Sequence, residues 1–222
     1  RAPKFHQQGE SGSECWVQLE LKVMADVGLV GFPNSGKSTF ISIISKAKPK
    51  IDDYPFTTLV PQLGVVNTKN FDPFVIADIP GIIEGAHNGR GLGHRFLRHI
   101  ERTKCLIIML DVSGFSEKPP KEEYNSLIRE LDLYSSKLIK KSRIIVLTKI
   151  DTVSDFEELD NLQLFLESKK ENVFRISSLS KAGIPELINF LETFVKKDRN
   201  SFIEDPKRDK KSTPSEYSIW ND

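Results

Sequence analysis

The chain contains 222 residues, of which 38% are hydrophobic and 28% charged, with 32 Lys and Arg against 31 Asp and Glu. This length suits one large domain with appendages, and the composition is typical of a globular protein rather than a disordered or fibrous one. A formal net charge of +1 excludes a polycation that binds nucleic acid through bulk charge, although it leaves room for a local basic patch. The apolar runs are too short to span a bilayer, so we expect no membrane span.

The first 24 residues form a region of their own. The sequence begins with Arg1 and not Met, so we expect a piece of a longer protein. Residues 1–14 are polar and rich in Gly and Ser, and apolar residues alternate with polar ones over Val17–Val23, which predicts a half-buried strand. We assign residues 1–24 to a linker and the last strand of a preceding, mostly absent domain. The two cysteines predict neither a disulfide framework nor a zinc site and favour a reducing, cytosolic setting.

Short apolar runs without alternation follow, and such runs predict strands that are buried on both faces of a parallel sheet. They are Val27–Val30, Phe74–Ala77, Cys105–Leu110, Ile144–Leu147 and Val173–Ile176. Leu63–Val66 closely precedes the Phe74 run, so this pair predicts a hairpin and one antiparallel edge strand.

Helical periods of apolar residues separate the predicted strands. Their apolar positions are Phe40, Ile43, Ile44 and Ala47; Tyr124, Leu127, Ile128, Leu131 and Leu138; and Ile184, Leu187, Ile188 and Leu191. The capping-box spacing Ser154-x-x-Glu157 predicts the start of one further helix, and Pro185 after Gly183 marks the start of the helix over Ile184–Leu191. Alternating strands and helices predict a doubly wound α/β domain over residues 25–198. The polar residues 199–222 are expected to be a disordered extension.

Residues 31–38 match the phosphate-binding pattern G-x-x-x-x-G-K-[ST] without deviation, between a predicted strand and a predicted helix. Backbone N–H groups of such a loop converge on a β-phosphate at the helix N-terminus. Lys37 is expected to reach the β- and γ-phosphates, and the Ser38 hydroxyl to bind Mg²⁺. The expected nucleotide contacts are Gly31, Phe32, Pro33, Asn34, Ser35, Gly36, Lys37 and Ser38.

An acidic residue at the end of a second buried strand completes the phosphate site. Asp78 ends the Phe74 run and is expected to hold Mg²⁺ through water, while the N–H of Gly81 meets the γ-phosphate. Gly81 also serves as a hinge when that phosphate leaves. Ile79 and Pro80 lie between them and are expected to contact the nucleotide.

Two segments predict which base is bound. Thr148, Lys149, Ile150 and Asp151 resemble the guanine signature [NT]-K-x-D, in which the carboxylate accepts from N1–H and N2–H₂ and the lysine stem covers the purine. Threonine in place of the more usual asparagine removes an amide that ties this segment to the phosphate loop. Ser177, Ser178 and Leu179 stand where the guanine-binding pattern has a Ser-Ala pair whose backbone N–H meets O6. Together these segments favour guanine over adenine.

The sequence resembles the Obg (CgtA) family of bacterial and organellar GTPases from Trp16 to Lys197, most specifically at residues 53–61, 78–86 and 91–102. The resemblance implies a P-loop G domain with a six-stranded, mostly parallel sheet and helices on both faces. It also implies GTP/GDP and Mg²⁺ as ligands, a cytoplasmic or organellar-matrix location, and a role in ribosome (large-subunit) assembly and growth control. Partners would be ribosomal particles and their RNA, and we expect a monomer.

The resemblance also assigns roles by position. The first switch is Phe56, Thr57, Thr58, Leu59 and Val60, with Thr58 as the second Mg²⁺ ligand beside Ser38. The second switch begins at Asp78, and the expected catalytic groups are Lys37, Asn34 and Gly81. Arg95, Arg98 and Arg102 lie on one helix face, which is either a solvated surface or a nucleotide-sensitive contact with ribosomal RNA.

The predicted activity is slow GTP hydrolysis. Ile82 follows Gly81, where Ras-like switches have the Gln that orients the attacking water. Asn34 either holds a K⁺ ion against the phosphates in place of an arginine finger, or braces the loop through hydrogen bonds. Two alternatives stay open: a guanine-nucleotide sensor with negligible turnover and, against the evidence of Thr148–Asp151, a P-loop ATPase.

Overall fold

The computed structural model describes residues 9, 11, 12, 14–16, 25–45, 62–68, 73–78, 103–134 and 136–203. In chain order the described elements are β1 (Ala25–Val30), α1 (Lys37–Ile44), β2 (Gln62–Val66), β3 (Phe74–Asp78), β4 (Thr103–Asp111), α3 (Pro120–Tyr134), α4 (Ser136–Ile139), β5 (Arg143–Thr148), the 3₁₀ helix η2 (Ile150–Thr152), α5 (Phe156–Ser168), β6 (Asn172–Arg175) and α6 (Ile184–Ile203).

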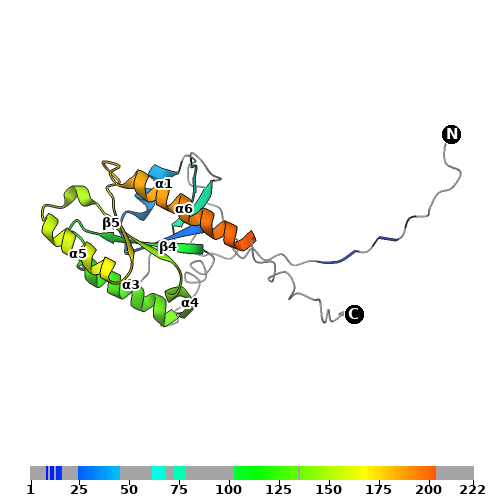
Figure 1. The fold of residues 1–222 in the computed structure, drawn as a ribbon, viewed down its shortest axis with the longest axis horizontal. Helices are drawn as coiled ribbons and strands as arrows, with labels where there is room; N and C mark the ends of the chain where they lie inside the picture. Colours follow the sequence, from blue (N-terminus) through cyan, green and yellow to red (C-terminus); the bar gives the residue numbers. More distant parts are fainter. Residues whose placement is uncertain are drawn as a thin grey trace.

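The strands form one six-stranded sheet in the order β2-β3-β1-β4-β5-β6 (Figure 1). Every neighbouring pair is parallel except β2 and β3, which form an antiparallel hairpin with Val66 opposite Phe74. The sheet confirms the predicted fold class, including the antiparallel edge strand. The carboxyl ends of β1, β3, β4 and β5 therefore meet along one edge, where ligands bind in open α/β sheets.

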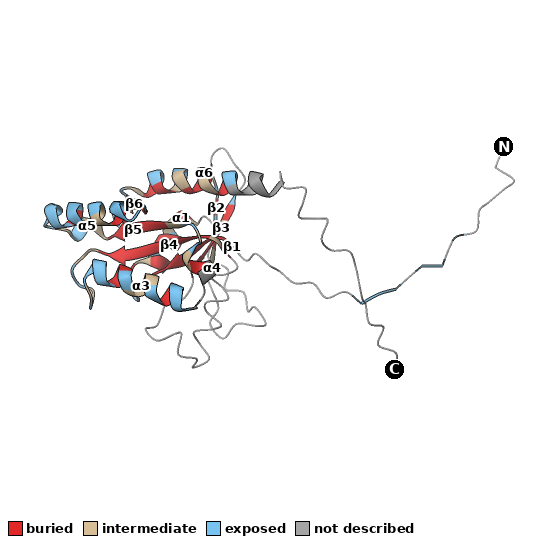
Figure 2. Cartoon of the chain, turned by 60° about the horizontal axis from the view of Figure 1, so that its bottom comes forward, coloured by how far each residue is buried: buried red, intermediate tan, exposed pale blue. Residues whose placement is uncertain are grey.

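Helices cover both faces of the sheet, and this explains why the strands show no polar alternation (Figure 2). In β4, Leu106, Ile108 and Leu110 belong to the core under α3, α4 and α5. Their neighbours Cys105, Ile107 and Met109 belong to the core under α1 and α6. Both sets are fully buried, so side chains on either face must be apolar.

The start of α5 differs from the prediction. The N-cap is Asp155 and not Ser154: its Oδ1 accepts from the N–H groups of Glu157 and Glu158 at 2.9 and 3.1 Å. Both residue types cap helices well, but a carboxylate also gains from the positive end of the helix dipole. The predicted capping box is therefore wrong by one residue.

Two other helix predictions need correction. The apolar period from Tyr124 to Leu138 is divided between two helices, because α3 ends at Tyr134 and α4 begins at Ser136. Helix α6 runs to Ile203, past the domain boundary predicted at residue 198, because extending a formed helix costs much less than starting one. At β6 the strand ends at Arg175, so Ile176 already lies in the loop.

Some predicted features lie outside the described residues: the Val17–Val23 strand, Ala47, and most of the 199–222 extension. Cys105 is buried and Cys15 exposed, and neither forms a disulfide bond within the part of the chain that the structure describes. Among the described helices, none combines the length and the apolar character that a membrane crossing requires.

Candidate nucleotide-binding site

The phosphate loop joins the carboxyl end of β1 to α1, and its backbone takes conformations that few residues tolerate. Asn34 and Gly36 have φ values of 65° and 90°, both in the left-handed region. A Cβ atom on Gly31 would lie 2.6 Å from the Met109 carbonyl oxygen and 2.6 Å from the Ser35 Oγ, so only glycine fits. No side chain caps the N-terminus of α1 at Gly36, so its N–H groups are available to an anion.

Lys37 is buried within this loop. Its Nζ donates to the carbonyl oxygens of Gly31 at 3.0 Å and Phe32 at 2.9 Å, and lies 3.4 Å from the Ser35 Oγ. Burial lowers the pKa of the Lys37 ammonium, and the negative charges of Asp78 and Glu123 partly offset this effect. The loop therefore holds a positive charge at the place where the sequence predicts phosphates.

Ser38 and Asp78 meet at the adjoining sheet edge, as the sequence predicts. The Ser38 Oγ donates to the Asp78 Oδ2 at 2.7 Å, although the two residues are 40 positions apart. The other carboxylate oxygen of Asp78 is buried and has no hydrogen-bond partner among the described residues. A hydroxyl beside a carboxylate with an unused oxygen fits a hard cation such as Mg²⁺.

The predicted base-reading segment, Thr148–Asp151, begins at the last residue of β5 and is joined to the phosphate loop. The Thr148 hydroxyl, 2% exposed, lies 3.0 Å from the Ser35 carbonyl oxygen. The asparagine amide is absent here, and the threonine hydroxyl makes its own connection to the phosphate loop. Lys149 has a φ of 62° and precedes the 3₁₀ helix η2, which carries the exposed Asp151.

The loop after β6 lies against the same segment. The N–H of Ile150 donates to the Ile176 carbonyl oxygen at 3.3 Å. Ser177 is fully buried, and its Oγ accepts from the Ser180 N–H at 3.0 Å, whereas the Leu179 side chain is 85% exposed. Hydrogen bonds therefore join the loop after β6 to the Thr148–Asp151 segment, and that segment to the phosphate loop.

Sequence reasoning missed two buried acidic residues at this edge. Asp111, at the end of β4, pairs with Lys149: the Oδ2–Nζ distance is 2.5 Å. Glu123, in the first turn of α3, is 1% exposed and accepts from the Ser116 hydroxyl. An acidic residue directly after a buried strand identified Asp78, and the same signal was present at Asp111. Nothing in the pattern around Glu123 distinguishes it from a solvated helix residue.

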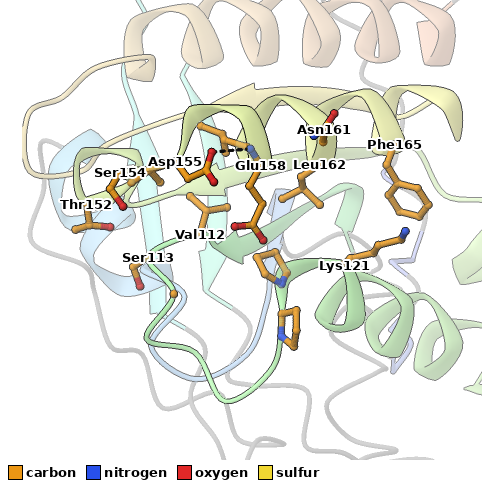
Figure 3. Close-up of a pocket in the computed structure, with 15 residues that line it drawn as sticks. Val112, Ser113, Lys121, Thr152, Ser154, Asp155, Glu158, Asn161, Leu162 and Phe165 are labelled. Carbon is orange, nitrogen blue, oxygen red and sulfur yellow. Dashed lines mark hydrogen bonds between the residues drawn. The ribbon is translucent and has the colours of Figure 1, made fainter.

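A pocket of about 380 Å³ lies beside the turn that follows the base-reading segment (Figure 3). Its walls are the loop after β4, including Val112 and Ser113, the Thr152–Asp155 turn, and one side of α5. The Lys121 Nζ lies 4.3 Å from the centre of the Phe165 ring at the far end. No lining residue belongs to the phosphate loop, so this pocket is separate from the phosphate site.

The predicted switch residues Phe56–Val60, including Thr58, and Ile79–Gly81 lie outside the described residues. The same holds for Ile82 and for the arginines at 95, 98 and 102. Their predicted roles therefore stay predictions.

Comparison with solved structures supports the fold. The G domain of the T. maritima FeoB iron transporter is similar with a TM-score of 0.56 and 22% identity, over 74% of this chain and 94% of that one. The cytosolic domain of the same transporter in its GMPPNP form gives a TM-score of 0.59 and 19% identity, over 78% of this chain and 64% of that one.

Curated relatives are much closer in sequence. GTPase Obg of Thermodesulfovibrio yellowstonii is 54% identical over 197 residues, which are 89% of this chain and 58% of that protein. GTPase Obg of Clostridioides difficile is 50% identical over 88% of this chain and 46% of that protein. The predicted resemblance is thus confirmed, and the chain spans about half the length of these relatives.

Two family models match the chain. One, described as ethanolamine utilisation–propanediol utilisation, matches residues 129–193 only. The other covers residues 26–149, from β1 through the phosphate loop to Lys149 in the base-reading segment. By that match, the chain belongs to the family of 50S ribosome-binding GTPases.

Proposed function

We propose that this protein binds GTP and GDP with Mg²⁺, hydrolyses GTP slowly, and acts as a nucleotide-dependent switch in assembly of the large ribosomal subunit. The observation that supports this proposal most directly is the Thr148–Ser35 hydrogen bond, because it joins the phosphate loop to the predicted base-reading segment at one sheet edge. The family match and the Obg relatives support the same activity.

Within this proposal the described residues have distinct roles. The N–H groups of the phosphate loop and Lys37 bind the β- and γ-phosphates, and the Asp151 carboxylate accepts from the guanine edge. Ser38 would hold Mg²⁺ directly and Asp78 through water, and the metal would supply positive charge beside the phosphate oxygens. The Lys37 ammonium stabilises the negative charge that develops during phosphoryl transfer.

Slow hydrolysis is expected from what the second switch lacks. An isoleucine at position 82 offers neither donor nor acceptor to an attacking water. Turnover should therefore be far below about one per second without a partner. Phosphate release under single-turnover conditions tests this. Release over minutes to hours supports a slow GTPase, whereas no release above the spontaneous rate supports a guanine-nucleotide sensor.

The proposed ribosomal partner needs a separate experiment. Co-sedimentation of this protein with purified large and small subunits should be compared with a non-hydrolysable GTP analogue, with GDP and without nucleotide. We expect pelleting with the large subunit that depends on the nucleotide. Lys37→Ala, which removes the phosphate-binding ammonium, should abolish that dependence. Co-sedimentation that does not depend on the nucleotide, or no co-sedimentation at all, would contradict the proposed switch.

A further inference from the structure

The buried Asp111 carboxylate uses both of its oxygens. Oδ1 accepts from the Ser113 N–H at 2.9 Å, and Oδ2 lies 2.5 Å from the Lys149 Nζ. Burial alone would raise the pKa of Asp111, but the hydrogen bonds from Lys149 and Ser113 outweigh it and lower the pKa. The carboxylate therefore stays ionised and holds the ammonium.

This ion pair joins the end of β4 to the base-reading segment. Asp111 stands opposite Thr148 in the parallel β4–β5 register, and Lys149 follows directly. Thr148 is tied to the phosphate loop, and Asp151 lies two residues further on in η2. The Lys149 side chain keeps 37% of its surface exposed while its tip is held, so the pairing does not enclose the side chain.

Glu123 is a second acidic group near the Asp111–Lys149 pair. Glu123 has one oxygen that accepts from Ser116 and another, buried, that has no hydrogen-bond partner within the described ranges. Its charge and that of Asp111 repel each other, and Lys149 attracts both. The Lys149 ammonium thus lies near two carboxyl groups, and it forms its ion pair with Asp111.

We propose that Asp111 is a positioning residue for base binding, acting through Lys149. By holding the Nζ, it keeps the aliphatic stem of Lys149 in place as a ready wall of the base site, so the side chain loses little freedom when a nucleotide binds. This inference rests on the proposed guanine-nucleotide binding. Because Asp111 does not touch the hydrogen-bonding edge of the base, it raises the affinity for GDP and GTP equally and leaves base selectivity to Asp151.

Asp111→Asn isolates this role. The amide oxygen keeps the Ser113 contact, whereas the NH₂ group that replaces Oδ2 faces the Lys149 ammonium as donor against donor. We expect the Kd values for GDP and GTP to rise by about tenfold, which is about 1.4 kcal/mol, with an unchanged ratio between GTP and xanthosine triphosphate. Asp160→Asn is the matched control. Asp160, on α5, forms an ion pair of 2.6 Å with Arg175, and loss of this ion pair should leave both Kd values unchanged.

A double-mutant cycle separates positioning from a structural role of Asp111. In a Lys149→Met background, Asp111→Asn should cause no further loss of affinity, because the ammonium on which it acts is gone. Losses that multiply in the double variant would overturn the proposal, as would an Asp111→Asn protein that binds like the wild type.

The lysine variants keep the test decisive if Asp111→Asn does not fold. Lys149→Arg retains a charge for Asp111 and should bind GDP more tightly than Lys149→Met, and equal binding by the two would overturn the proposal. A wild-type chain that bound no guanine nucleotide would instead refute the proposed function itself.

Discussion

The Thr148 hydroxyl lies 3.0 Å from the Ser35 carbonyl oxygen and 3.1 Å from that of Leu110. One buried side chain thus connects the base-reading segment, the phosphate loop and the end of β4. We therefore expect a nucleotide that orders the phosphate loop also to fix the predicted base-reading segment.

Replacing Thr148 with valine tests this connection. Valine has nearly the same shape but no hydroxyl, so the two buried carbonyl oxygens that share its single O–H proton lose that donor, which typically costs about 1–3 kcal/mol. We expect the free energy of unfolding in urea to fall by that amount and GDP binding to weaken. Thr152→Val is the control. The Thr152 hydroxyl donates to the Lys149 carbonyl oxygen at 2.8 Å but is exposed, so little change is expected. Equal effects of the two variants would contradict the role of Thr148.

Asp151→Asn should change which purine is bound. The amide donates where the carboxylate only accepts, so GTP binding should weaken and xanthosine triphosphate binding should improve. A bidentate base contact is worth about 1–3 kcal/mol, so each Kd should move by roughly 10- to 100-fold. Competition against a fluorescent nucleotide measures both values. An Asn variant that bound GTP as well as the wild type would show that Asp151 does not read the base.

K⁺ is predicted to accelerate GTP hydrolysis, with Na⁺ much less effective. Asn34 is exposed, and within the described residues its amide makes no hydrogen bond that would brace the loop, which leaves the oxygen available to a cation. Hydrolysis rates should be compared in matched KCl and NaCl at constant ionic strength.

The choice of variant follows from the backbone at Asn34. Because φ is 65°, Asn34→Gly removes the amide without strain, and Asn34→Ala serves as the second variant. Both should lose the K⁺ effect. Equal rates in the two salts would refute a role for K⁺ in hydrolysis. A K⁺ effect that survives in both variants would show that Asn34 does not hold the ion.

Glu123 should make stability depend on pH. Burial raises the pKa of Glu123, and the neighbouring Asp111 charge acts in the same direction. The folded state thus holds this proton more tightly than the unfolded one. The stabilisation is complete below the ordinary glutamate value of about 4.3 and is lost as pH rises through the raised pKa.

Glu123→Gln keeps the acceptor for Ser116 but cannot titrate. Its free energy of unfolding relative to the wild type should therefore increase from about pH 4.3 toward neutrality. Because the pKa of Asp111 is lowered, that residue titrates below this range and does not obscure the comparison. A difference between the two proteins that stays constant with pH would contradict the raised pKa.

The sequence predicted most of this fold because the signals are local. Buried parallel strands leave uninterrupted apolar runs, and the glycines of the phosphate loop mark places that a larger residue cannot occupy, as at Gly31, where a Cβ atom would clash with the Met109 carbonyl oxygen. The meeting of Ser38 and Asp78 followed from knowing that both stand at the carboxyl edge of one parallel sheet.

Contacts between side chains were harder to foresee. The Lys149–Asp111 pair joins residues 38 positions apart, and its existence depends on the β4–β5 register, which no local pattern reports. At Thr148 the sequence comparison showed only that the asparagine amide is missing, and it gave no role to the hydroxyl that contacts Ser35. The N-cap at Asp155 was missed because Ser154 and Asp155 are both good caps, and the choice between them depends on the path of the preceding turn.

The most direct test of the account is displacement of a fluorescent guanine nucleotide from this chain by GTP and by ATP in the presence of Mg²⁺. The account predicts that GTP and GDP displace the probe at low concentration, whereas ATP fails even in large excess, because adenine lacks the donor pair that Asp151 reads. Removal of Mg²⁺ should weaken GTP binding. Displacement by ATP as effective as that by GTP, or no binding of the probe at all, would contradict the account.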